Sequence, residues 1–135
     1  MPHNIYKSLT IVNSYMEYLL PQEIQVRYVL PAIRGEMAKA MVDEGMSQRE
    51  AARMLGMTEG AISQYLSGKR ANYVVLGAEL AAEVRKSAGS VRENRTVLMG
   101  ELIRLSNHEK ALELMCRMHK ETFPKTMKGC NICFE

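Results

Sequence analysis

The chain has 135 residues, the length of one domain or of one small domain with an appendage. Hydrophobic residues make up 47% and charged residues 24%, a balance that favours a packed core. The formal net charge of +3 permits a nucleic-acid partner without requiring one. No apolar run approaches the length of a membrane span, and the N-terminus lacks the pattern of a signal peptide. We therefore expect a cytoplasmic protein with no membrane partner.

The spacing of apolar residues predicts helices along the first third of the chain. Residues 5–19 fit a short amphipathic helix, and Pro21 suits the first turn of a second one. Pro31 predicts a break, because the residue before a proline avoids the helical region. A further helix is expected over residues 32–44, with Gly45 as its C-terminal cap. These elements predict a compact helical bundle.

The next stretch, residues 47–70, has the pattern of two short helices joined by a tight turn. Ser47 and Glu50 have the spacing of a capping box at the start of the first helix. Gly56 supplies the left-handed residue that ends it, and Thr58 suits the cap of the second helix. The apolar residues at helical spacing here are Ala51, Ala52, Leu55, Met57, Ile62, Tyr65 and Leu66. Taken singly, these features also fit an ordinary αα-hairpin, but their order at fixed offsets is that of a helix-turn-helix.

This stretch resembles the phage-repressor (XRE/Cro-type) class of helix-turn-helix. The longer span LLPQEIQVRYVLPAIRGEMAKAMVDEGMSQREAARMLGMTEGAISQYLSGKR, residues 19–70, is similar to the N-terminal domain of a group of archaeal regulators. In that group "LP.E…R.VLPAIR" precedes "TQ.AVSQYLSGKR". The sequence departs from the pattern at Glu59 and Gly60, where the family usually has Gln and Ala, so the bases recognised are expected to differ. Arg34 lies in the matching span; a solvated side chain, a phosphate contact and an ion pair all remain open for it.

In this motif the front of the second helix enters the major groove of double-stranded DNA. Ser63 and Gln64 are expected at base edges, and Lys69 and Arg70 at phosphates. Glu59 opposes this interpretation, because its carboxylate would repel phosphate. The residues predicted to contact DNA are Gln48, Thr58, Glu59, Gly60, Ser63, Gln64, Lys69 and Arg70.

Three more helices are predicted after residue 73. The first ends at Gly89, the second begins at Val91 or Glu93 and ends at Ser106, and the third is capped by Asn107. Their apolar surface has two interpretations, which are not exclusive. It forms the interface of a homodimer, with candidates Val97, Leu102 and Ile103, or it packs back on the N-terminal bundle.

All three cysteines lie within the last twenty residues, in the arrangement C-x2-H…C-x2-C. Three thiolates and one imidazole form a complete tetrahedral ligand set for Zn²⁺. The predicted metal ligands are Cys116, His119, Cys130 and Cys133. An iron–sulfur cluster is the alternative cofactor, although such clusters usually take four thiolates. Free thiols and a dithiol redox pair remain open, and a structural disulfide is not expected in the cytosol. Many of the archaeal regulators that the sequence resembles carry a cysteine-rich segment after the helix-turn-helix.

The sequence thus predicts an all-α protein. Residues 1–72 are expected to form a repressor-like DNA-binding domain, and residues 73–135 a helical extension for dimerisation that ends in a metal-binding knuckle. The predicted function is a sequence-specific, homodimeric transcriptional regulator, with no enzymatic activity and no evident small-molecule substrate. Its metal site would be structural or would sense redox state or metal. The alternatives are a protein-interaction module built on the helix-turn-helix and a dithiol redox protein.

Overall fold

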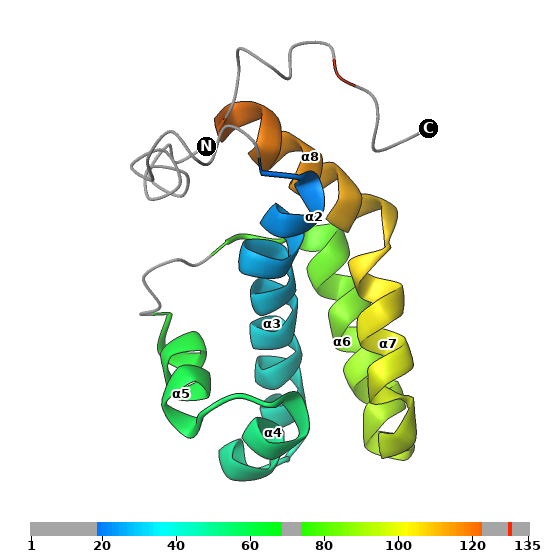
Figure 1. Cartoon of the computed structure of the whole chain (residues 1–135). Helices are drawn as coiled ribbons and strands as arrows, with labels where there is room; N and C mark the ends of the chain where they lie inside the picture. Colours follow the sequence, from blue (N-terminus) through cyan, green and yellow to red (C-terminus); the bar gives the residue numbers. More distant parts are fainter. Residues whose placement is uncertain (1–18, 69–73, 123–129, 131–135) are drawn as a thin grey trace.

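The computed structural model describes residues 19–68, 74–122 and 130 (Figure 1). The described part of the chain is helical and contains no strand, which confirms the predicted all-α class. In chain order the elements are α2 (Pro21–Ile24), the π-helical turn η2 (Gln25–Val29), α3 (Leu30–Asp43), α4 (Gln48–Leu55), α5 (Glu59–Ser67), α6 (Ala78–Glu93), the 3-10 turn η3 (Arg95–Val97), α7 (Leu98–Ser106) and α8 (Glu109–Thr122). The N-terminal helix expected over residues 5–19 lies almost wholly outside the described residues.

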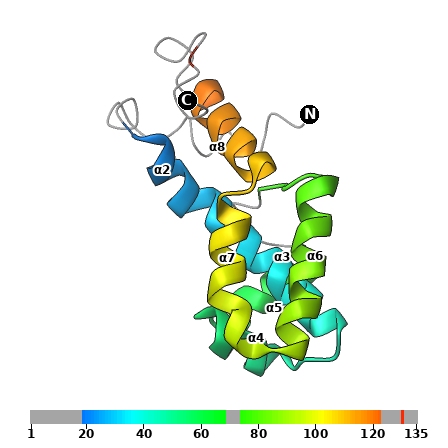
Figure 2. The same ribbon diagram turned by 90° about the vertical axis from the view of Figure 1, so that its right-hand side faces the viewer.

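Helix α3 is the central element of the fold. Helices α4 and α5 pack on one side of it, α6 and α7 pack on the other, and α8 lies across α2 at the far end (Figures 1 and 2). The apolar spacing within residues 32–44 predicts Ile33, Met37, Ala40 and Met41 on the inner face of α3, and all four are buried. One continuous core joins them to Leu80 and Val84 of α6 and to Leu105 of α7.

The predicted break at Pro31 is wrong, because α2 continues into α3 through the π-helical turn η2. In this wider turn the Leu30 N–H donates to the Gln25 carbonyl, five residues back. Pro31 lacks an N–H, and in a regular helix its ring would meet the carbonyl four residues earlier. A widened turn directly before the proline relieves both problems, so the chain stays helical.

The pair α4–α5 has the capping that its sequence predicts. The Ser47 hydroxyl accepts from the Glu50 N–H (3.1 Å), and the Thr58 hydroxyl accepts from the Ala61 N–H (3.0 Å). Gly56 and Gly68 end the two helices with φ of 64° and 71°, the left-handed region that favours glycine. Only half of the predicted capping box forms, because the Glu50 carboxylate pairs with Arg95 instead of the Ser47 N–H.

The helix boundaries in the C-terminal half differ from those predicted. Gly89 lies inside α6, and the chain turns at Asn94, whose side chain accepts from the Thr96 N–H (3.1 Å). Asn107 does not cap α8; its amide donates to Ile103 at the end of α7. The imidazole of His108 takes that place by accepting from the Lys110 N–H at 3.0 Å.

Helix α6 lies along α3, so the C-terminal helices do pack back on the N-terminal bundle. The predicted domain boundary at residue 72 falls within residues 69–73, which lie outside the described residues, and it stays a prediction. Among the helices of residues 19–68 and 74–122, none is long and apolar enough to cross a membrane.

Candidate nucleic-acid interface

Helix α5 presents one polar face outward and one apolar face inward. Ile62 and Tyr65 are buried against α3, at 0% and 3% exposure. The exposed residues fall on a single arc of the helix, because they occur at spacings of one, three and four residues. The exposed face consists of Glu59, Gly60, Ser63, Gln64 and Ser67. The structure therefore brings four of the residues predicted at DNA onto one surface.

A close contact with α3 fixes the position of α5. The Tyr65 hydroxyl donates to the carbonyl of Pro31 at 2.8 Å, which ties α5 to the first turn of α3. Gly35 of α3 packs against the Tyr65 ring, and a Cβ atom built at this position would overlap the ring atoms. A residue without a side chain is thus required for the two helices to cross this closely. Sequence reasoning missed Gly35, because a helical glycine alone carries no sign of what packs against it.

The turn between α4 and α5 is held by Arg34, for which the sequence left three interpretations open. Its guanidinium donates from Nη1 to the Leu55 carbonyl at 2.7 Å, at the C-terminal end of α4. A cation at this position also opposes the partial negative charge of the helix end. Arg34 is exposed but tied to α4, and its hydrogen bond stabilises the end of that helix next to Gly56.

The charges on α4 and α5 favour an anionic partner only slightly. Arg49 and Arg53 are exposed on α4, whereas the Glu50 carboxylate is engaged by Arg95. Glu59 remains as an exposed acidic side chain on the outward surface of α4 and α5, where its charge opposes that of the two arginines. Sequence reasoning did not single out Arg49 and Arg53, although their spacing of four residues places them side by side on a helix surface.

A groove of about 710 Å³ adjoins this surface between α5 and the start of α3. Gly60 and Gln64 form part of its wall, and Val26, which is 62% exposed, lies on the opposite side. Gln64 therefore borders both the outward face of α5 and an apolar depression. Gln48 and Thr58 are exposed at the first turns of α4 and α5. Lys69 and Arg70, the predicted phosphate contacts, lie outside the described residues.

Residues 37–72 match the family model described as helix-turn-helix. This range contains most of α3, all of α4 and α5, and the capped turn between them. The match supports a helix-turn-helix of the XRE type over these residues. A helix-turn-helix of this kind supports a DNA-binding regulatory role at the level of the family. No curated protein and no solved structure matched the chain. The resemblance to the archaeal group stays a prediction.

Two of the four predicted metal ligands lie on the inner face of α8. Cys116 and His119 are 7% and 4% exposed, and the His119 Nε2 atom lies 2.6 Å from the Leu19 carbonyl oxygen. Cys116 and Cys130 are free thiols, and Cys133 lies outside the described residues. Within the ranges 19–68 and 74–122 and at Cys130, no three His, Cys, Asp or Glu residues are grouped to hold an ion.

Proposed function

We propose that this protein is a sequence-specific DNA-binding transcriptional regulator that recognises the major groove with helix α5. The observation that carries this proposal is the outward face of α5, where Glu59, Gly60, Ser63 and Gln64 are exposed together within the matched helix-turn-helix domain. The side of the helix behind them is anchored through Tyr65, so the face is presented on a rigid support. A rigid helix with a polar outer face is what base recognition requires.

The side chains on this face have distinct expected roles. Gln64 offers an amide that pairs bidentately with adenine, and a good bidentate pair is worth about 1–3 kcal/mol of discrimination. Arg49 and Arg53, together with Lys69 and Arg70, are the candidates for phosphate contacts, which position the domain without selecting sequence. Gln48 and Thr58 lie at the front of their helices and are expected at the edge of the interface.

The test is selection of bound fragments from genomic DNA, followed by anisotropy titrations at several salt concentrations. Gln64→Ala should reduce the preference for the selected site over random DNA by roughly tenfold. Arg49→Gln should weaken binding to the selected site and to random DNA alike. It should also reduce the slope of log K against log salt concentration by about one. Arg85→Gln, on the exposed side of α6, is the matched control and should change neither. Binding that is indifferent to Gln64→Ala and Arg49→Gln alike would exclude this face as the DNA reader.

We also propose that the regulator is a homodimer, because a single helix-turn-helix contacts too few base pairs to select one genomic site. Two half-sites about 34–36 Å apart would then be bound together. Of the three predicted interface residues, Leu102 is buried in the core and Val97 packs against it. Ile103 is 56% exposed and lies one turn from Met99, which is 70% exposed. These two side chains, which share one stripe of α7, are the proposed centre of the interface.

Light scattering tests the dimer. Ile103→Glu should halve the mass in solution and weaken binding to a two-half-site fragment, whereas Val75→Glu, a charge on another exposed apolar residue, should leave both unchanged. Equal masses for the Ile103→Glu variant and the wild type would place the interface elsewhere.

We further propose that Cys116, His119, Cys130 and Cys133 bind one metal centre per chain. The chemistry of the donor set fits zinc, which is satisfied by three thiolates and one imidazole. A hydrogen bond between the His119 ring and the Leu19 carbonyl is the arrangement that orients metal-ligating histidines in proteins. Bound zinc would close the segment between α8 and Cys133 and leave no open coordination position.

Elemental analysis and the visible spectrum of anaerobically purified protein test the metal site. Zinc at one equivalent in colourless protein supports the proposal, and loss of zinc in Cys130→Ser should confirm the ligand. Brown protein that contains iron would show that the centre is an iron–sulfur cluster and not zinc. Neither element, with all three thiols titratable in the folded protein, would exclude both.

A further inference from the structure

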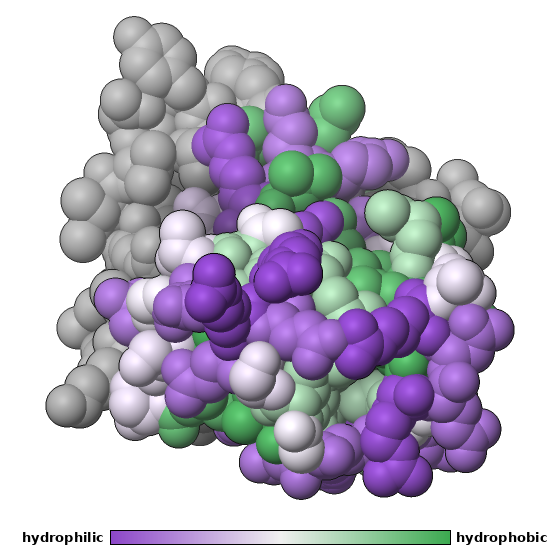
Figure 3. Space-filling model, turned by 90° about the horizontal axis from the view of Figure 1, so that it is seen from below, coloured by the Kyte–Doolittle hydropathy of each residue, from purple (hydrophilic) through white to green (hydrophobic). Residues whose placement is uncertain are grey.

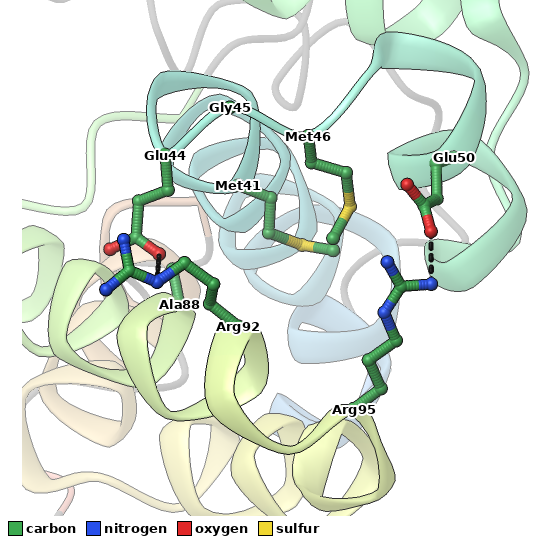
Figure 4. Close-up of a pocket in the computed structure, with 8 residues that line it drawn as sticks. All are labelled: Met41, Glu44, Gly45, Met46, Glu50, Ala88, Arg92 and Arg95. Atoms are coloured by element: carbon green, nitrogen blue, oxygen red, sulfur yellow. Dashed lines mark ion pairs between the residues drawn. The ribbon is translucent and has the colours of Figure 1, made fainter.

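A small cavity lies between the helix-turn-helix side of the molecule and the α6–η3 corner. Its volume is about 230 Å³, and it opens at the end of α3, where the chain turns into α4. Figure 3 shows this end of the molecule, where hydrophilic side chains surround smaller apolar areas. The residues that line it are Met41, Glu44, Gly45, Met46, Glu50, Ala88, Arg92 and Arg95. Figure 4 shows two ion pairs on either side of the two methionines.

The two guanidinium groups in this cavity keep unused hydrogen-bond donors. Arg92 approaches the Glu44 carboxylate only loosely, with its Nε atom 3.9 Å from Oε2. Within the described part of the chain its two terminal NH₂ groups have no hydrogen-bond partner. Arg95 pairs with Glu50 through Nη1 and is 59% exposed. Two forked cations that share one small cavity are suited to a carboxylate, which a guanidinium binds through two parallel N–H groups.

The rest of the lining limits what kind of carboxylate fits. Glu44 and Glu50 balance the charge of the two arginines, so a simple anion gains little net attraction. A ligand that carries an ammonium beside its carboxylate would satisfy Arg92 and Glu44 together. Met41, Met46 and Ala88 provide an apolar wall, and methionine adapts to differently shaped groups. The volume lies below the range of about 300–1,000 Å³ for drug-sized ligands.

From these features we infer that the cavity binds a free α-amino acid with an uncharged side chain. The carboxylate lies on the terminal NH₂ groups of Arg92, the ammonium on the Glu44 carboxylate, and the side chain against Met41 and Met46. Because an α-amino acid carries both charges on one carbon, a single loose ion pair supplies both partners. This site is separate from the outward face of α5, and its assignment does not depend on DNA binding.

Isothermal titration calorimetry of the full chain against each natural L-amino acid, without DNA, tests the inference. At least one amino acid with an uncharged side chain should bind with a Kd below about 1 mM. The matching 2-oxo acid, which lacks the ammonium, and the matching amine, which lacks the carboxylate, should bind at least about tenfold more weakly.

Variants locate the site. Arg92→Gln should lower the affinity by roughly tenfold, because a charge-assisted hydrogen bond is lost. Arg85→Gln, two turns earlier on α6 and outside the cavity, is the matched control and should bind as the wild type does. Circular dichroism melting of each variant without ligand confirms that it folds. The inference is overturned by the absence of binding, by equal binding of the 2-oxo acid, or by unchanged affinity in Arg92→Gln.

Discussion

Replacing Gly35 with alanine tests whether the close crossing of α3 and α5 positions helix α5. The added methyl group would overlap ring atoms of Tyr65, which is 3% exposed. The ring is held in place by its hydroxyl, which is bonded to the Pro31 carbonyl at 2.8 Å, so moving the ring would break that bond. Either α5 must move outward or the ring must leave its position.

Two effects of opposite sign determine the size of the change. Alanine is favoured over glycine inside a helix by about 0.8–1.0 kcal/mol. Overpacking a core costs about 1–3 kcal/mol and occasionally more, and an overlap with a tethered ring belongs at the upper end. The expected net loss in the free energy of unfolding is therefore about 2 kcal/mol. In a chain of this length it corresponds to a Tm lowered by roughly 6–10 °C.

Thermal unfolding followed by circular dichroism is the assay, and Gly100→Ala is the matched control. Gly100 lies inside α7 with no atom near its potential Cβ, so alanine there should raise the Tm by about 3–5 °C. In a Tyr65→Leu background, Gly35→Ala should lose most of its cost, because the ring is gone. If Gly35→Ala melts at or above the wild-type temperature, as Gly100→Ala should, the close contact does not limit this site.

Three further changes follow from single interactions. Thr58→Ala removes the cap of α5 and should lower stability by about 1 kcal/mol in urea unfolding, with Thr58→Ser as the control that keeps the hydroxyl. Arg34→Gln should lower it by about 1–2 kcal/mol through loss of the charged donor to the Leu55 carbonyl, and an unchanged midpoint would refute that role. The hydrogen bond from Arg104 lowers the pKa of Glu101. The ionised carboxylate therefore stabilises the fold at every pH above the ordinary glutamate pKa, and this stabilisation is lost as the pH falls through the lowered pKa. Glu101→Gln should accordingly be less stable than the wild type near neutral pH, and the difference should vanish in acid; a constant difference would exclude the ion pair as its cause.

Sequence reasoning succeeded where a local signal determines the structure. Ser47, Gly56 and Thr58 are specified by backbone donors and dihedral angles within four residues of each, so their roles follow from spacing alone. The buried faces of α3 and α4 follow in the same way from helical periodicity. The outward residues of α5 were predictable because they occupy the helix positions that lie outside the apolar periodicity of this segment.

The remaining features depend on partners that are distant in the sequence. The Glu50 carboxylate pairs with Arg95, forty-five positions away, instead of completing the expected capping box. Arg34 donates to the Leu55 carbonyl at the end of α4, which only the tertiary fold brings close to it. Leu102 was predicted at a dimer interface because it belongs to an apolar stripe, but its side chain on α7 is buried in the core. Gly89 did not end α6, because packing on α3 outweighs the modest helix propensity of one glycine.

The π-helical turn accommodates one extra residue within the continuous helix that α2 and α3 form. Because its hydrogen bond spans five residues, the turn takes one residue more than a regular α-helical turn does, and the helix axis continues past Pro31. The side chains before the turn therefore still face α8: the Gln25 amide reaches the Ser106 carbonyl at 2.6 Å, and the Leu19 carbonyl lies 2.6 Å from the His119 ring. A deletion within Gln25–Val29 would force a regular turn at this point, in which the Pro31 ring meets a backbone carbonyl, so the cost would fall on the junction that joins α8 to the rest of the fold.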